Sequence, residues 1–159
     1  MQLPITRERE TLDKLLQDKN WKGLESFGIT DAKKEPSTLD CVQYVFHLLG
    51  VPANPEMMIA LQELKKSDNA PAEGIVFYQR WTDKGLTVMH YGIVEADHPV
   101  IRKEKLVRSK WGSESPVLHH PLKLVPAAYG QSAVFCTMKA AREYVNEKRN
   151  LNIFGPDNY

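Results

Sequence analysis

The residue whose type and position best suit covalent chemistry is Cys41. A helix is predicted to begin at Thr38 or Asp40 and to end at Leu49, just before the stop signal at Gly50. With either start, Cys41 lies in the first helical turn, where unpaired backbone N–H groups and the positive end of the helix dipole favour thiolate over thiol. The same N–H groups can stabilise an oxyanion formed when the thiolate attacks a carbonyl. Cys41 is therefore a candidate nucleophile.

A nucleophilic cysteine needs a general base, and the best-placed histidine is His90. It interrupts a β-rich run at residues 86–95, in which Val88, His90, Gly92 and Val94 are expected to share one face. Gly92 lacks a side chain and so lets another element approach closely. A cysteine that opens a helix and a histidine on a later strand form the arrangement that thiol catalysis uses.

Each of these residues also has a purely structural interpretation. A free cysteine is among the most buried residue types, and a single histidine on a strand more often serves structure than catalysis. Cys136 is expected to fill the core, Asp40 to cap a helix and His98 to lie in a turn. Trp81 and Trp111 are expected either to line a substrate groove or to pack in the core or at its rim.

Helices are expected mainly in the first half of the chain and strands in the second. The predicted helices span residues 6–24, 38 or 40–49, 55–67 and 139–149. The predicted strands span residues 75–78, 86–95, 105–111, 116–122 and 133–137. This order favours an α+β fold with helices, chiefly N-terminal ones, packed on one side of an antiparallel sheet. We expect one domain over residues 1–150 and a polar C-terminal tail over residues 151–159.

The composition predicts one soluble globular domain: of 159 residues, 42% are hydrophobic and 26% charged, and the net charge is +1. Nucleic-acid binders and polybasic membrane-surface proteins need a charge excess that this chain lacks. Two cysteines make no disulfide framework, and no CxxC or HExxH spacing occurs, so neither a metal nor a cofactor is expected. The apolar runs are too short for a membrane span, and the charged N-terminus does not fit a signal peptide.

Three segments together carry a family resemblance. They are Asp-Cys-Val-Gln-Tyr-Val at residues 40–45, Glu-Gly-Ile-Val-Phe-Tyr at 73–78, and His-Tyr-Gly-Ile-Val at 90–94. In order and spacing they resemble the nucleophile helix, the following strand and the histidine strand of the NlpC-type papain-like cysteine peptidases. The resemblance covers residues 37–95 and is looser to about residue 130. It implies a papain-like fold in which Cys41 is the nucleophile and His90 its base.

Some segments depart from that family pattern or resemble only part of it. Val42 and Gln43 follow the cysteine where the family usually has small residues, and Glu73 precedes a glycine that the family usually follows with an acid. Residues 109–112, 120–121 and 125–130 resemble a segment of bacterial relatives of this group; the last of these contains Val-Pro, a tyrosine and a glycine.

A third group is expected to orient the imidazole, and the resemblance places it on the strand after the histidine strand. That strand, predicted at residues 105–111, offers Ser109 and Lys110. A charged lysine cannot accept a hydrogen bond, which favours Ser109. His120, or its neighbour His119, is the alternative on the next segment, unless the two histidines lie in an exposed loop. The residues alone do not decide between these candidates.

These inferences predict a cysteine hydrolase that cleaves an amide bond through an acyl-enzyme, in a cell-wall peptide if the resemblance extends to substrate. Two alternatives stand beside it: a protein-modifying deamidase or acyltransferase effector on the same fold, and a non-catalytic binding or immunity module. The expected partner is a peptide or peptidoglycan fragment, or a protein target, and not nucleic acid. Without a signal peptide, the protein is expected either in the cytoplasm or exported by a leaderless route.

Overall fold

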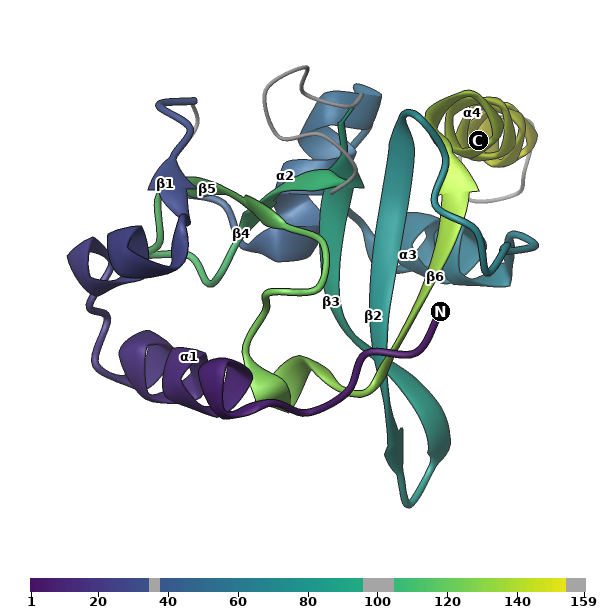
Figure 1. Ribbon diagram of the computed structural model, residues 1–159. Helices are drawn as coiled ribbons and strands as arrows, with labels where there is room; N and C mark the ends of the chain where they lie inside the picture. The colour runs from purple at the N-terminus through teal and green to yellow at the C-terminus, as the bar shows by residue number, and fades with distance from the viewer. Residues whose placement is uncertain (35–37, 96–104, 154–159) are drawn as a thin grey trace.

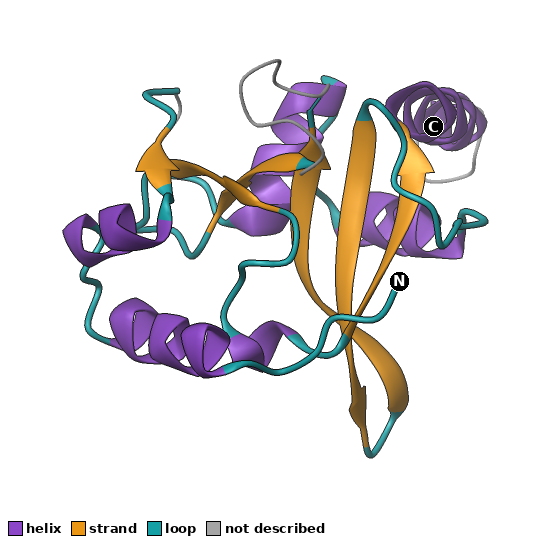
Figure 2. Ribbon diagram, in the orientation of Figure 1, coloured by secondary structure: helices purple, strands orange, loops and turns teal. Residues whose placement is uncertain are grey.

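The computed structural model describes residues 1–34, 38–95 and 105–153, with side chains to residue 150. Within these residues, strands form one antiparallel sheet in the order β1-β5-β4-β3-β2-β6, and helices cover both of its faces (Figures 1 and 2). The strands are β1 (Thr30–Asp31), β2 (Gly74–Thr82), β3 (Gly85–Val94), β4 (Leu106–Lys110), β5 (Val117–Pro121) and β6 (Ser132–Thr137). Helices combined with an antiparallel sheet confirm the predicted α+β class.

The helices largely follow the sequence predictions, but their ends differ. They are α1 (Arg7–Gln17), α2 (Cys41–Leu49), α3 (Pro55–Glu63), α4 (Met138–Ile153) and two 3-10 helices, η1 (Lys22–Phe27) and η2 (Ala127–Tyr129). The prediction of one helix over residues 6–24 is wrong, because Lys19 has a left-handed backbone with φ of 52° and turns the chain before η1 begins. Thr6 caps α1 as expected, accepting a hydrogen bond from the Arg9 N–H.

The third and fourth predicted helices also change. α3 stops at Glu63 rather than at residue 67, because Leu64 adopts an extended backbone. The residues of α3 that face the core are Met57, Ala60 and Leu61, which follow helical spacing. Met58 is only half-buried. α4 continues to Ile153, past the expected domain end at residue 150. Residues 154–159, together with His98, lie outside the described residues.

Alternation along the strands gives the sheet two apolar faces. In β2, Ile75 and Phe77 pack against α2, α3 and α4, whereas Val76 and Tyr78 pack beneath α1 and η1. The expectation that helices cover only one side of the sheet is therefore wrong (Figure 2). The reason is that β2 is apolar at consecutive positions, and a strand of that kind must be covered on both faces.

An irregularity in the β2–β3 hairpin changes which residues of β3 share a face. Tyr78 pairs with His90, but Gln79 pairs with Val88, so Met89 is an extra residue in a β-bulge. Val88 consequently packs with the α2 side of the sheet, while His90 faces the α1 side. The predicted common face for Val88 and His90 is wrong because an inserted residue reverses the alternation.

Candidate active site

The cysteine that opens α2 is held by a reciprocal cap. Asp40 is the N-cap, and its Oδ1 accepts a hydrogen bond of 2.8 Å from the Gln43 N–H. The Gln43 Oε1 in turn accepts one of 3.0 Å from the Asp40 N–H, which completes a capping box. Gln43 is one of the residues that depart from the resembled family, and its part in the capping box explains the glutamine at this position. The cap fixes Cys41 at the first helical position, as the sequence predicts.

Strand β4 leaves β3 early and makes room for the thiol. The two strands pair only at Ile93–Arg108 and Val94–Val107, and then diverge (Figure 1). The N–H of Glu95 bonds to the carbonyl of Leu106 in the strand region of β4. By the two-residue alternation of an antiparallel ladder, the N–H of Tyr91 points to the same side.

The Cys41 thiol occupies that place and receives a hydrogen bond from the Tyr91 N–H. Tyr91 directly follows His90 in β3. The start of α2 therefore contacts the strand that carries the candidate base. Burial raises the pKa of Tyr129, and a thiolate at Cys41 would raise it further; Tyr129 lies on the opposite side of β3 together with His90. The structure therefore brings Cys41 to the strand that carries the candidate base.

Opposing effects act on the Cys41 thiol. Burial raises its pKa, and the neighbouring Asp40 carboxylate adds to that effect. Hydrogen bonds from the backbone N–H groups of Tyr91, Val42 and Cys41 itself lower the pKa. Burial prevails and the net pKa is raised, so the resting residue is a neutral thiol surrounded by three N–H donors.

The His90 ring is buried between aromatic side chains. It stacks on Tyr129 with the ring centroids 4.1 Å apart and the planes 7° from parallel, and the Tyr78 ring lies 5.6 Å away. Burial, with a further contribution from His120, holds the pKa of His90 well below its usual value. Its Nε2 atom has no hydrogen-bond partner among the described residues. His90 is thus a neutral imidazole with an available ring nitrogen.

Gly92 lets β4 cross close to the His90 face of β3. A Cβ atom at this position would lie 2.7 Å from Val107 Cγ1 and 3.2 Å from Ser109 Cβ. The missing side chain therefore permits the close approach that the sequence predicts, and it brings Ser109 to the same face as His90.

Ser109 and His120, the two alternatives for a third residue, contact each other. The Ser109 Oγ lies 2.8 Å from the His120 Nε2, and the His120 Nδ1 lies 2.9 Å from the carbonyl oxygen of Pro121. A carbonyl only accepts, so Nδ1 carries the proton, and Nε2 accepts from the Ser109 hydroxyl. The Ser109 Oγ itself accepts from the Trp111 indole N–H at 3.2 Å. Both ring nitrogens of His120 are thus bonded elsewhere than to His90.

Of the remaining candidates, Trp111 contacts this cluster through its indole N–H, and the others lie apart from it. His119 is half-buried on β5, with its Nε2 3.1 Å from a Glu95 carboxylate oxygen, so the two histidines do not form an exposed loop. Lys110 is buried and donates to the carbonyl of Ser113. Trp111 packs in the core, whereas Trp81 is exposed on the β2–β3 hairpin. Cys136 is buried in β6 as expected, and burial raises its pKa to about 11.

Two residues of this region were not predicted as functional. Tyr129 stacks on His90, and the only signal for it is the Val-Pro and tyrosine-glycine segment near residue 125. Arg9 is almost fully buried and ties that segment to the N-terminus: it donates hydrogen bonds to the carbonyl oxygens of Val125, Pro126 and Gly130, and to those of Leu3 and Pro4. Its one signal is a position three residues before Leu12, on the apolar face of α1.

No family model, curated protein or solved structure matches this chain. Within the part of the chain that the structure describes, no group of three histidine, cysteine or acidic side chains is arranged to hold a metal ion. None of the described helices is both long and apolar enough to cross a membrane.

Proposed function

We propose that this protein is a cysteine hydrolase that cleaves an amide bond, with Cys41 as nucleophile and His90 as general base. One observation carries the proposal: the thiol that opens α2 bonds to the backbone beside His90, whose buried Nε2 is unpartnered among the described residues. An unsatisfied buried nitrogen is costly to a fold and is typical of a group kept available for a reaction. The resemblance to NlpC-type papain-like peptidases favours the same pair and a bond in a cell-wall peptide.

The protonation states favour general-base attack over a preformed ion pair. The pKa of Cys41 is raised and that of His90 is lowered, so both groups rest neutral. In the proposed reaction, His90 accepts the thiol proton as the sulfur attacks the substrate carbonyl carbon. The resulting oxyanion is stabilised by backbone N–H groups at the start of α2. The imidazolium then protonates the leaving amine, and water, activated by neutral His90, hydrolyses the thioester.

We further propose that stacking, rather than a hydrogen bond, orients the imidazole. Tyr129 lies parallel to the His90 ring and fixes its plane. Ser109 and His120 act on His90 indirectly. Burial lowers the pKa of His120 to about 4, and its hydrogen bond with Ser109 is the one that a neutral imidazole makes. A neutral His120 adds no full positive charge beside the imidazolium that forms during the reaction.

The decisive test is a Cys41-dependent product. The protein is incubated with peptidoglycan fragments and with blocked peptides, and mass spectrometry follows new amines and any acyl adduct on Cys41. We expect amide cleavage that Cys41→Ala abolishes and Cys136→Ala leaves intact, since Cys136 lies in β6, which β2 separates from β3. His90→Gln should also abolish it while circular dichroism shows a folded protein.

Each alternative function gives a different result in the same experiment. A deamidase would leave the peptide chain intact and raise the mass of a glutamine-containing target protein by about one dalton, and an acyltransferase would require an added amine. A binding or immunity module would show no Cys41-dependent product with any substrate. That last result, or activity that survives Cys41→Ala, would refute the proposed hydrolase.

A further inference from the structure

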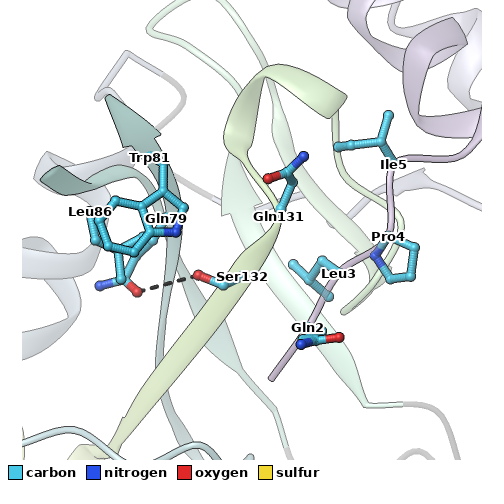
Figure 3. Close-up of a pocket in the computed structure, with 9 residues that line it drawn as sticks. All are labelled: Gln2, Leu3, Pro4, Ile5, Gln79, Trp81, Leu86, Gln131 and Ser132. Atoms are coloured by element: carbon cyan, nitrogen blue, oxygen red, sulfur yellow. Dashed lines mark hydrogen bonds between the residues drawn. The ribbon is translucent and has the colours of Figure 1, made fainter. Parts of the chain in front are cut away.

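A groove of about 450 Å³ lies between the outer end of the β2–β3 hairpin and the N-terminal segment (Figure 3). Trp81 and Leu86 form one wall, and Leu3 and Ile5 lie on the other side. The described residues include four exposed large apolar side chains, and three of these, Ile5, Trp81 and Leu86, line this groove. A concentration of exposed apolar groups in one concave place marks a binding surface.

The lining of the groove is uncharged. Its polar residues are Gln2, Gln79, Gln131 and Ser132, and the others are apolar. A charged ligand would find no counter-ion here and would lose its hydration. Glutamine side chains, by contrast, donate and accept hydrogen bonds as peptide groups do. The groove therefore suits a neutral ligand that carries amide groups.

The backbone of β2 adds an edge that no other described strand pairs with. The pairing of β6 with β2 ends at Ser132–Gln79, three residues before β2 ends at Thr82. The carbonyl of Gln79 accepts from the Gln131 N–H, so the backbone groups of Gln79 face the β6 side. By alternation, the N–H and C=O of Trp81 face the same side, where β6 no longer runs. An open strand edge of this kind can pair with another extended segment.

We propose that this groove binds an extended peptide with uncharged side chains, which adds a short strand to the free edge of β2 beside Trp81. Backbone hydrogen bonds to Trp81 would set its register, and alternate side chains would contact Trp81 and Leu86. The claim that such a peptide is a substrate rests on the proposed function. The claim that the groove binds it does not.

The groove borders segments that also contact the candidate base. Gln79 directly follows Tyr78, which pairs with His90, and Gln131 lies two residues after Tyr129, which stacks on His90. A peptide held along the hairpin therefore lies next to the elements that carry the base.

Binding is tested on the Cys41→Ala protein, in which no turnover can occur. The probe is a library of acetylated and amidated heptapeptides built from Ala, Val, Leu, Tyr and Gln, followed by amide-resolved NMR. We expect shifts at Trp81, Gln131 and Leu3, and none at Ile59, which lies exposed between α3 and α4. Trp81→Ala should weaken the best peptide by about tenfold or more, as expected for a central aromatic anchor, whereas Ile59→Ala should not.

N-methylated peptides test strand addition directly. Methylation of alternate residues removes the N–H groups that face β2 in one set and those that face solvent in the other. We expect one set to bind about tenfold more weakly and the other to bind almost unchanged. Equal binding by both sets, no shifts at millimolar peptide, or unchanged binding to Trp81→Ala would overturn the proposal.

The same spectra distinguish a bound peptide from a second copy of the chain in the groove. Shifts at the groove that depend on protein concentration without peptide would show that a second copy occupies it, and would also overturn the proposal. If peptides bind at Trp81 but wild-type protein never cleaves an amide, the groove proposal is upheld and the hydrolase proposal fails. If cleavage occurs and Trp81→Ala changes neither KM nor binding, the groove proposal fails alone.

Discussion

At the scale of single residues, the candidate nucleophile is governed by a balance between burial and hydrogen bonding. Three backbone N–H groups stabilise the thiolate of Cys41, while burial and the carboxylate of Asp40 destabilise it. The cap residue thus has two effects: it fixes the helix start and it raises the pKa of the adjacent thiol. These effects can be separated because asparagine caps a helix about as well as aspartate does.

We predict that Asp40→Asn makes Cys41 more reactive without unfolding the protein. Loss of the carboxylate lowers the thiol pKa, so alkylation by iodoacetamide at pH 7.5 should become roughly threefold faster. The free energy of unfolding should change by less than about 0.5 kcal/mol, because the cap is retained. Site-resolved mass spectrometry measures the rate at Cys41, and Asp18→Asn, at the end of α1, serves as the control. Slower alkylation would contradict the electrostatic role of Asp40.

At the scale of elements, β3 is shaped by features that each serve the site. A bulge at Met89 turns His90 to the α1 side of the sheet, and a two-pair register with β4 leaves the Tyr91 N–H free for the thiol. Gly92 then allows β4 to cross near His90 on its way to Ser109. The positions of the nucleophile, the base and the residues behind it thus depend on one strand and its neighbours.

Gly92→Ala should therefore disturb the site more than the addition of one methyl group suggests. The new Cβ would overlap Val107 Cγ1, and overpacking of this kind costs about 1–3 kcal/mol of unfolding free energy. Urea denaturation measures the loss, and the NMR signals of His120 should shift because β4 moves. Adding Val107→Ala removes the atom in the way, so the double variant should lose less than the two single losses added together. Strict additivity would show that this contact is not the cause.

At the scale of the whole molecule, the N-terminal segment and α1 close the far face of the sheet over the His90 cluster. Arg9 links this layer to the segment that carries Tyr129. It donates three hydrogen bonds to backbone carbonyls of that segment and two to carbonyls of the N-terminal segment. Burial lowers the pKa of Arg9, which shows that the charge is held at a cost and is compensated by those carbonyls.

Replacement of Arg9 by lysine should be strongly destabilising. An ammonium group has three donors and no planar fork, so it cannot satisfy carbonyls from both segments at once. We expect a loss of about 3 kcal/mol in urea denaturation, against almost none for Arg7→Lys on the exposed side of α1. The NMR signals of the His90 ring should also shift as Tyr129 loses its support. An Arg9→Lys protein of native stability would show that these hydrogen bonds contribute little.

The buried histidines predict acid sensitivity. The pKa values of His90 and His120 are lowered in the folded state, that of His120 to about 4, so the unfolded chain binds protons first as the pH falls. The contribution of His120 is therefore complete above about pH 6.5 and is lost progressively between there and about pH 4, by about 1.4 kcal/mol per pH unit. His90 acts in the same direction.

Urea denaturation at a series of pH values checks this prediction. His120→Gln should flatten the slope of unfolding free energy against pH between about 4 and 6.5, whereas His47→Gln, at an exposed position of α2, should not. A slope that is the same in wild-type and His120→Gln protein would contradict the assignment of neutral, buried His120.

The features of this protein that its sequence predicts correctly are local. Apolar spacing and Gly50 place α2 and set Cys41 at its start, and two β-rich runs place part of β2 and most of β3, with His90 in the second. These features depend on residues a few positions apart, whose propensities and hydrogen bonds act before any distant contact forms. The assignment of Cys41 and His90 as a catalytic pair stays a prediction.

The way in which these pieces meet depends on tertiary contacts. The bulge at Met89 and the early departure of β4 follow from pairings between separate segments, which local patterns do not encode. The sequence did not predict roles for Arg9 and Tyr129 for the same reason. Arg9 gains its role from carbonyls more than a hundred residues away. A buried charge is tolerated only where the fold supplies acceptors, and the fold alone shows where they are.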